Sequence, residues 1–178
     1  MFKDLKIIHW PDPRLVAMSK PVQIFDEALT ALAARMLELM REHRGVGLAA
    51  PQVGQNIRLF VMNHSGQPGD DRIYVNPMLS DADGEEEGEE GCLSLPEIYA
   101  RINRARQVRM SAKNLAGDAV EETADGYVAR VWQHEFDHLN GKLLMDRMSP
   151  AARLGVRKQL RELQAKWDKA HPAKVGAR

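Results

Sequence analysis

The sequence has little of several features that would define its class at once. Among 178 residues there is one cysteine, which excludes an internal disulfide and favours a reducing compartment such as the cytoplasm. The formal net charge is zero, since 25 basic residues balance 25 acidic ones, so binding to DNA through bulk charge is not expected. No apolar run reaches the length of a membrane span, and the first residues do not resemble a secretory signal. We therefore expect a cytoplasmic protein that binds neither DNA nor membrane.

The chain also lacks an internal repeat and any linker that would divide it. A chain of this length buries a useful core as one unit. We therefore expect a single domain over residues 1–178, in which residues 149–178 form a C-terminal helix and tail.

Apolar periodicity predicts the secondary structure. Asp26 is a good N-cap for an amphipathic helix that continues to about His43, and Gly45 stands where a C-cap glycine is expected. A long helix is predicted from about Ser149 to about Lys169. The pattern further predicts strands over 57–62 and 73–75, exposed loops over 63–71 and 81–90, a hairpin over 108–123 and a helix over 126–140.

One short stretch carries recognisable chemistry, Gln133-His134-Glu135-Phe136-Asp137-His138. Two histidines four residues apart on a helix project from the same face and can hold one divalent metal ion. The glutamate between them then lies beside the ion, where it can act as a general base. The alternative is a polar helix with two solvated or core histidines.

Two further stretches are ambiguous by themselves. The segment 45–52, Gly-Val-Gly-Leu-Ala-Ala-Pro-Gln, is either a tight connection or a wall of an active site with the Gln52 amide available to a substrate carbonyl. In Glu90-Gly91-Cys92-Leu93-Ser94, the only cysteine is buried filler, a nucleophile or a metal ligand.

Taken together and in this order, the three motifs resemble those of bacterial-type peptide deformylases, over residues 5 to about 150. The resemblance implies an α+β fold: small antiparallel sheets around a central helix that carries the His-Glu-x-x-His motif, plus an N-terminal and a C-terminal helix. It also implies a metal-dependent hydrolase that removes the N-formyl group from the formyl-methionine of newly made polypeptides.

The resemblance assigns roles residue by residue. It makes Cys92, His134 and His138 the metal ligands, and Glu135 the group that takes a proton from water and delivers it to the departing amine. It places the Gln52 amide and the Leu93 backbone N–H around the oxyanion. It also implies substrate binding by Gly45, Val46, Gly47, Leu48, Tyr127, Arg130 and Val131, and support of the metal site by Glu90, Arg104 and Asp137.

In one respect the sequence departs from the family pattern. Arg130 and Gly88 occupy positions where the family often has an aliphatic residue, in the expected pocket for the methionine side chain. We expect the aliphatic stem of Arg130 to pack in that pocket while its charged head stays in solvent.

The resemblance also implies a cofactor and partners. It implies one divalent metal per chain, natively Fe(II), for which zinc, nickel or cobalt can substitute; the ligand types alone would suggest zinc equally. The expected partners are N-formyl-methionyl nascent peptides and, through the basic face of the last helix, the ribosome. Two other classes remain open at this point: a metalloprotease with the same helix motif, and a non-catalytic metal-binding or interaction protein.

Overall fold

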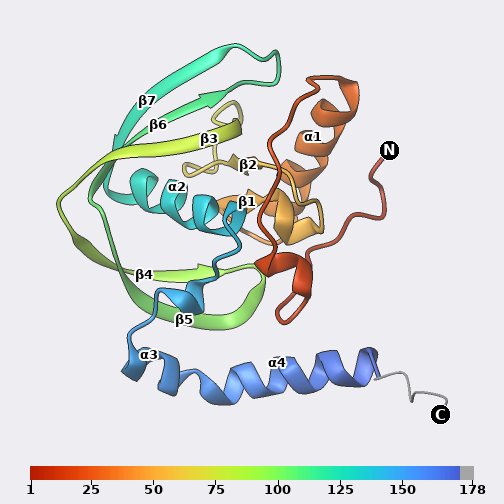
Figure 1. The fold of residues 1–178 in the computed structure, drawn as a ribbon, viewed down its shortest axis with the longest axis vertical. Helices are drawn as coiled ribbons and strands as arrows, with labels where there is room; N and C mark the ends of the chain where they lie inside the picture. Colours follow the sequence, from red (N-terminus) through yellow and green to blue (C-terminus); the bar gives the residue numbers. More distant parts are fainter. Residues whose placement is uncertain (173–178) are drawn as a thin grey trace.

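Helix α2, residues Gly126–Leu139, lies at the centre of the fold between two antiparallel sheets (Figure 1). The structure is a computed structural model, and it describes residues 1–172. The architecture is α+β, as predicted. None of the helices within these residues is long and apolar enough to cross a membrane.

The larger sheet has five strands in the order β1-β2-β3-β6-β7, and the smaller sheet consists of β4 and β5. Every neighbouring pair is antiparallel. The strands are β1 (Gly47–Ala49), β2 (Leu59–Met62), β3 (Arg72–Asp83), β4 (Glu86–Cys92), β5 (Leu95–Arg104), β6 (Gln107–Lys113) and β7 (Ala119–Asp125).

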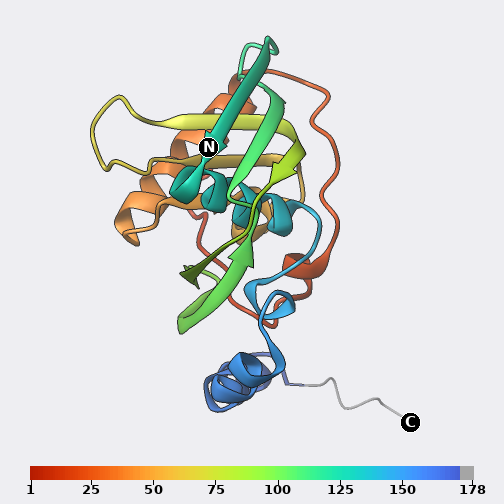
Figure 2. The same ribbon diagram turned by 90° about the vertical axis from the view of Figure 1, so that its left-hand side faces the viewer.

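Four helices and three short 3-10 turns complete the described chain. Helix α1, Glu27–Glu42, packs on the five-stranded sheet, whereas α3 (Pro150–Gly155) and α4 (Arg157–Ala170) lie apart from it beyond β5 (Figures 1 and 2). The 3-10 turns are η1 (Pro13–Val16), η2 (Ala50–Val53) and η3 (Leu144–Asp146).

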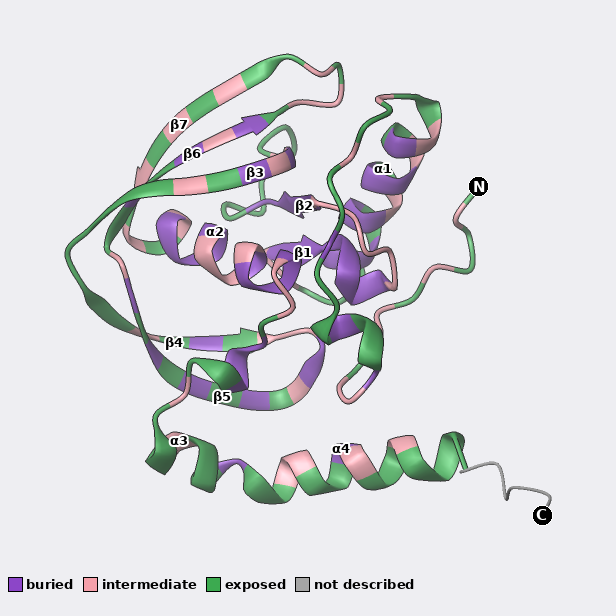
Figure 3. Cartoon of the chain, in the orientation of Figure 1, coloured by how far each residue is buried: buried purple, intermediate pink, exposed green. Residues whose placement is uncertain are grey.

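The core is built around α2 because its apolar side chains face the larger sheet. Ala129, Trp132 and Leu139 are buried there together with Phe60 and Tyr74. The rings of Tyr74 and Trp132 meet edge to face with centroids 5.7 Å apart, a favourable aromatic geometry. The colouring by burial shows this centre, in contrast to the largely exposed α4 (Figure 3). The helix that carries the metal-binding motif is therefore held rigidly.

Several predicted elements are confirmed. Helix α1 begins after Asp26, whose carboxylate accepts a hydrogen bond from the Leu29 N–H. The hairpin β6–β7 and the helix ending at Asn140 occur where the pattern indicated. Residues 63–71 form a connection between β2 and β3.

Three predictions about local structure were wrong. Residues 81–90 are mostly strand, because β3 continues past Pro77 through a bulge and turns at Gly84 into β4. The last helix is broken between Gly155 and Arg157. The left-handed residue after α1 is Arg44, with φ 56°, and Gly45 follows it and donates its N–H to the Met40 carbonyl. For residues 81–90, strand pairing with β6 and β5 outweighed the local signal.

Candidate metal centre

Three side chains from two elements meet at one point beside α2. Cys92 ends β4, and His134 and His138 project from one face of α2 one turn apart. Their possible ligand atoms all lie within 4.8 Å of one another, and Cys92 Sγ is 3.3 Å from His138 Nε2. The structure thus brings together the three residues that the motifs suggested as ligands.

The donor set fits a divalent metal ion. A tetrahedral ion with bonds of about 2.0–2.3 Å holds its ligand atoms on the order of 3.5 Å apart, close to the separation present here. Burial disfavours an imidazolium at His134, yet the neighbouring Cys92 and Glu90 raise the pKa of that histidine well above its ordinary value. Burial and the neighbouring His134 lower the pKa of His138 well below its ordinary value, which favours the neutral imidazole that a metal ligand requires.

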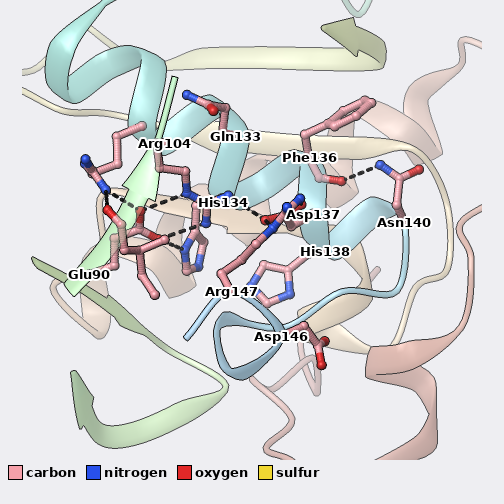
Figure 4. A network of polar contacts seen from close by, with 12 residues as sticks. Glu90, Arg104, Gln133, His134, Phe136, Asp137, His138, Asn140, Asp146 and Arg147 are labelled. Carbon is pink, nitrogen blue, oxygen red and sulfur yellow. Dashed lines mark hydrogen bonds and ion pairs between the residues drawn. The ribbon is translucent and has the colours of Figure 1, made fainter. Parts of the chain in front are cut away.

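Glu90 fixes the ring of His134. Its carboxylate Oε2 lies 3.0 Å from His134 Nδ1, which leaves Nε2 for a metal. Arg104 binds the same carboxylate through Nε and Nη2, both at 2.9 Å, and Figure 4 shows this network beside α2. Burial alone would raise the pKa of Glu90, but the hydrogen bonds from Arg104 and His134 keep it well below its ordinary value. The predicted contact between Glu90 and Arg104 is present.

The network extends further than the sequence indicated. Arg104 Nη1 donates to Asp137 Oδ2 at 2.5 Å, and Arg147 donates to both oxygens of that buried aspartate (Figure 4). Gln133 holds α2 to the β5–β6 connection through both the N–H and the carbonyl of Ala105. Arg147 was missed because nothing in its local sequence distinguishes it from surface polar residues. Gln133 lies in the stretch that contains the two histidines, but its contact with Ala105 joins residues 28 positions apart, so no local pattern indicates it.

Glu135 points toward β1 and away from this network. It is 3% exposed, and its Oε2 has no hydrogen-bond partner among residues 1–172. Burial raises its pKa to about 7. A Cβ on Gly47 would lie 2.9 Å from Glu135 Cδ and closer still to Oε1, so only glycine leaves room for this carboxylate.

Gln52 lies on the other side of the cysteine. Its Oε1 accepts a hydrogen bond from the Ala49 N–H at 2.8 Å, which directs the amide Nε2 toward Cys92 Sγ at 3.6 Å. Ser94, which is fully buried, accepts from the same Nε2 at 3.3 Å. Ser94 belongs to the motif around Cys92, but its contact with Gln52 joins residues 42 positions apart and was not predicted. Leu93 follows Cys92 in the turn between β4 and β5.

A cavity of about 690 Å³ opens beside the three candidate ligands. Gly47 and Leu48 do not line it: the side chain of Leu48 is fully buried against α1, and Gly47 has no side chain and lies against Glu135. Tyr127 stands half-exposed in its wall. Of the predicted substrate-binding residues, the cavity is lined by Gly45, Val46, Tyr127, Arg130 and Val131.

The prediction for Arg130 was wrong in one respect. Its head is not in solvent, since the residue is 7% exposed and its guanidinium is bound by protein acceptors. Burying a cation is costly unless it is paired, and Glu90 supplies the pairing here.

Comparison with known proteins gives concordant findings. The family model described as polypeptide deformylase matches residues 4–154. A curated peptide deformylase of Thermotoga neapolitana is 50% identical over 153 residues, which is 85% of this chain and 92% of the relative. The peptide deformylase 1B of Arabidopsis thaliana, described as chloroplastic/mitochondrial, is 39% identical over 98% of this chain and 66% of its own length.

Solved structures agree with this. A plant peptide deformylase superimposes with a TM-score of 0.93 at 37% identity, over 99% of this chain and 97% of its own. The peptide deformylase of Plasmodium falciparum gives a TM-score of 0.90 at 35% identity, over 95% of this chain and 100% of its own.

The geometry predicts which residues retain metal. Cys92→Ala is expected to lose most of the bound metal, because it removes one of three ligands and the remaining pair binds weakly. His9→Ala is the matched control, since His9 lines the same cavity but is not one of the three clustered residues. Elemental analysis of metal per chain measures the effect, and full stoichiometric retention in Cys92→Ala would exclude Cys92 as a ligand.

Proposed function

The chain belongs to the polypeptide deformylase family, a family of metal-dependent hydrolases that remove the N-formyl group from nascent peptides, and on that premise we propose how its residues perform the reaction. The observation that carries the proposal is the cluster of Cys92, His134 and His138 beside the buried Glu135, whose Oε2 has no hydrogen-bond partner among the described residues. We take residues 1–178 as one catalytic domain.

Cys92, His134 and His138 hold one divalent metal in this proposal. Fe(II) is the native ion that the family resemblance implies, and zinc, nickel or cobalt can replace it. A bound ion supplies Lewis acidity, polarising the formyl carbonyl and acidifying water beside it. The chain would contribute three protein ligands, a thiolate and two neutral imidazoles, which is the number that catalytic sites of this kind use.

Glu135 is the proton carrier. It takes a proton from the attacking water and delivers it to the amine that departs with the peptide. A pKa of about 7, which follows from its burial, suits a group that must both accept and donate near neutral pH. Its position against Gly47 fixes the carboxylate on the side of the cavity where a substrate strand would lie.

Gln52 and Leu93 hold the oxyanion of the tetrahedral intermediate. Gln52 is suited to this role because its oxygen is already bound by the Ala49 N–H, so its amide N–H group faces the cluster. The backbone N–H of Leu93, one residue after Cys92, provides the second donor. Donors placed in advance need no reorganisation when the charge develops.

The substrate backbone is expected to pair with the segment Gly45–Leu48 as an added strand. The arrangement supports this, because β1 is an edge strand that pairs only with β2 within the described sheet. Val46, Tyr127, Arg130 and Val131 then line the pocket for the methionine side chain.

The metalloprotease alternative is disfavoured by the same site. Here Cys92 occupies the position beside the two histidines where such proteases need a carboxylate or a further histidine. A purely structural metal site is disfavoured by Glu135, because a buried carboxylate oxygen without a partner, here Oε2, is costly unless the function needs it.

Glu135→Gln tests the proton carrier. The substitution keeps the size of the side chain and removes the proton acceptor, so kcat/KM on a formyl-methionyl peptide should fall at least about a hundredfold while bound metal stays near wild type. Turnover at the wild-type rate with normal metal would refute the mechanism. Loss of the metal would instead identify Glu135 as a ligand.

Gly47→Ala tests whether the position of Glu135 matters. The new methyl group would displace the carboxylate, and a shift of about 1 Å at a catalytic group can cost on the order of a hundredfold in rate. We expect kcat to fall by more than about tenfold with metal content unchanged. Gly155→Ala is the control, because no atom lies within 4 Å of the added carbon there. Equal rates for both variants would contradict the assignment.

We also propose that the protein works in the cytoplasm on nascent chains, with α4 contacting the ribosome. Arg157, Lys158 and Arg161 are exposed on α4, and Arg153 is exposed on α3. The ribosome surface is rich in phosphate, so such a contact would weaken steeply with salt. The last residues of the predicted tail, 173–178, lie outside the described part of the chain.

Co-sedimentation with ribosomes tests this contact. A variant with Arg157, Lys158 and Arg161 replaced by alanine should lose most of its ribosome association at low salt, because exposed charges contribute binding and little stability. The control replaces three exposed basic residues elsewhere, Lys3, Lys6 and Arg109. Equal association of the two variants would rule out a docking role for α4.

A further inference from the structure

Arg130 is an unusual residue for the wall of an apolar pocket. It lies on α2 one turn before His134 and is almost fully buried, yet it lines the cavity next to the candidate metal ligands. A charged side chain is retained in such a place only when its charge is paired and its donors are satisfied.

The guanidinium is held from several directions. Nη1 donates to Glu90 Oε1 and to the Ile102 carbonyl, both at 2.8 Å, and Nη2 donates to the Glu86 carbonyl at 2.6 Å. These acceptors come from both strands of the β4–β5 sheet. The side chain is therefore fixed in one position, and its charge is balanced by a carboxylate that is itself buried.

The glycine at position 88 makes this position possible. A Cβ there would lie 2.8 Å from Arg130 Cζ and 2.9 Å from Nε, closer than real side-chain carbons approach. The guanidinium occupies the space that a side chain at residue 88 would fill. Gly88 and Arg130 are thus coupled. The side chain of Arg130, from α2, fills the volume that a side chain at position 88 of β4 would otherwise occupy.

We infer that Arg130 is a specificity-determining residue that limits the length of the first side chain of the substrate, and that Gly88 allows it to do so. The inference rests on the proposed function, because it assigns this pocket to the methionine side chain. An unbranched side chain would pack along the methylenes of Arg130 and reach no further than the fixed guanidinium. A longer chain would have to displace three hydrogen bonds, one of which is the ion pair with Glu90.

This inference is tested directly by varying the length of the first side chain of the substrate. Two formyl peptides are compared that differ only in the first residue, methionine in one and 2-aminooctanoate in the other. In Arg130→Leu the space over Gly88 becomes available, so the kcat/KM ratio of the long to the methionine substrate should rise at least about tenfold, since each added methylene in an apolar pocket is worth about 10–200-fold. Adding Gly88→Ile refills the space and should return the ratio toward that of wild type.

Thermal unfolding provides a measurement that does not depend on activity. Gly88→Ala should lower Tm more in the wild-type background than in Arg130→Leu, because the new methyl group meets the guanidinium only in the former. Gly155→Ala should have the same small effect in both backgrounds. Bound metal should stay near wild type in Arg130→Leu, because Arg104 still holds Glu90 against His134.

The results of these measurements distinguish a specificity role for Arg130 from a structural one. An unchanged length ratio in Arg130→Leu, or an equal fall in kcat/KM for both substrates, would overturn the inference and leave Arg130 with a structural role. Additive effects of Gly88→Ala and Arg130→Leu on Tm would overturn the coupling while leaving the proposed function intact. Failure of the wild-type, metal-loaded protein to deformylate the methionine substrate would overturn the proposed function and this inference with it.

Discussion

The buried carboxylate of Glu90 joins the parts of this molecule. It receives two hydrogen bonds from Arg104, one from Arg130 and one from His134. These partners come from β5 and from two successive turns of α2, so a single anion connects the smaller sheet to the central helix. Charges so deeply buried are tolerated only because every one is paired, and removing one partner would leave the others uncompensated.

Two glutamates within the same site have opposite pKa shifts because their surroundings differ. Glu90 is surrounded by cationic donors and its pKa is lowered, so it stays ionised and fixes a ligand ring. Glu135 is buried against Gly47 with one oxygen unpartnered, and burial raises its pKa to about 7. One carboxylate therefore stabilises the structure, while the other remains available to exchange a proton.

Most of the site could be predicted because its signals are local. The spacing of His134 and His138 needs only helical geometry, and the glycines near Gly45 indicate a close approach of another chain. The support for the site is not local. Arg147 reaches Asp137 across a loop, and Ser94 meets Gln52 from forty-two residues away, so no spacing in the sequence reports these contacts. The prediction of a loop over the acidic run 81–90 was wrong for the same reason. The segment has the composition of a loop, but it forms strands because it pairs with β6 and β5, which are distant in the sequence.

The sequence by itself determined the family, the order of the motifs and the helix that presents two histidines and a glutamate, because these depend on residue type and short spacing. It also drew attention to Arg130 and Gly88, which we expected to differ from the family pattern. Only the tertiary structure decided what that departure means, because the space above Gly88 is defined by β4 and filled from α2, forty-two positions further along the chain. Whether a charged side chain ends in solvent or in the core depends on the partners that folding brings to it, and here those partners are Glu90 and two strand carbonyls.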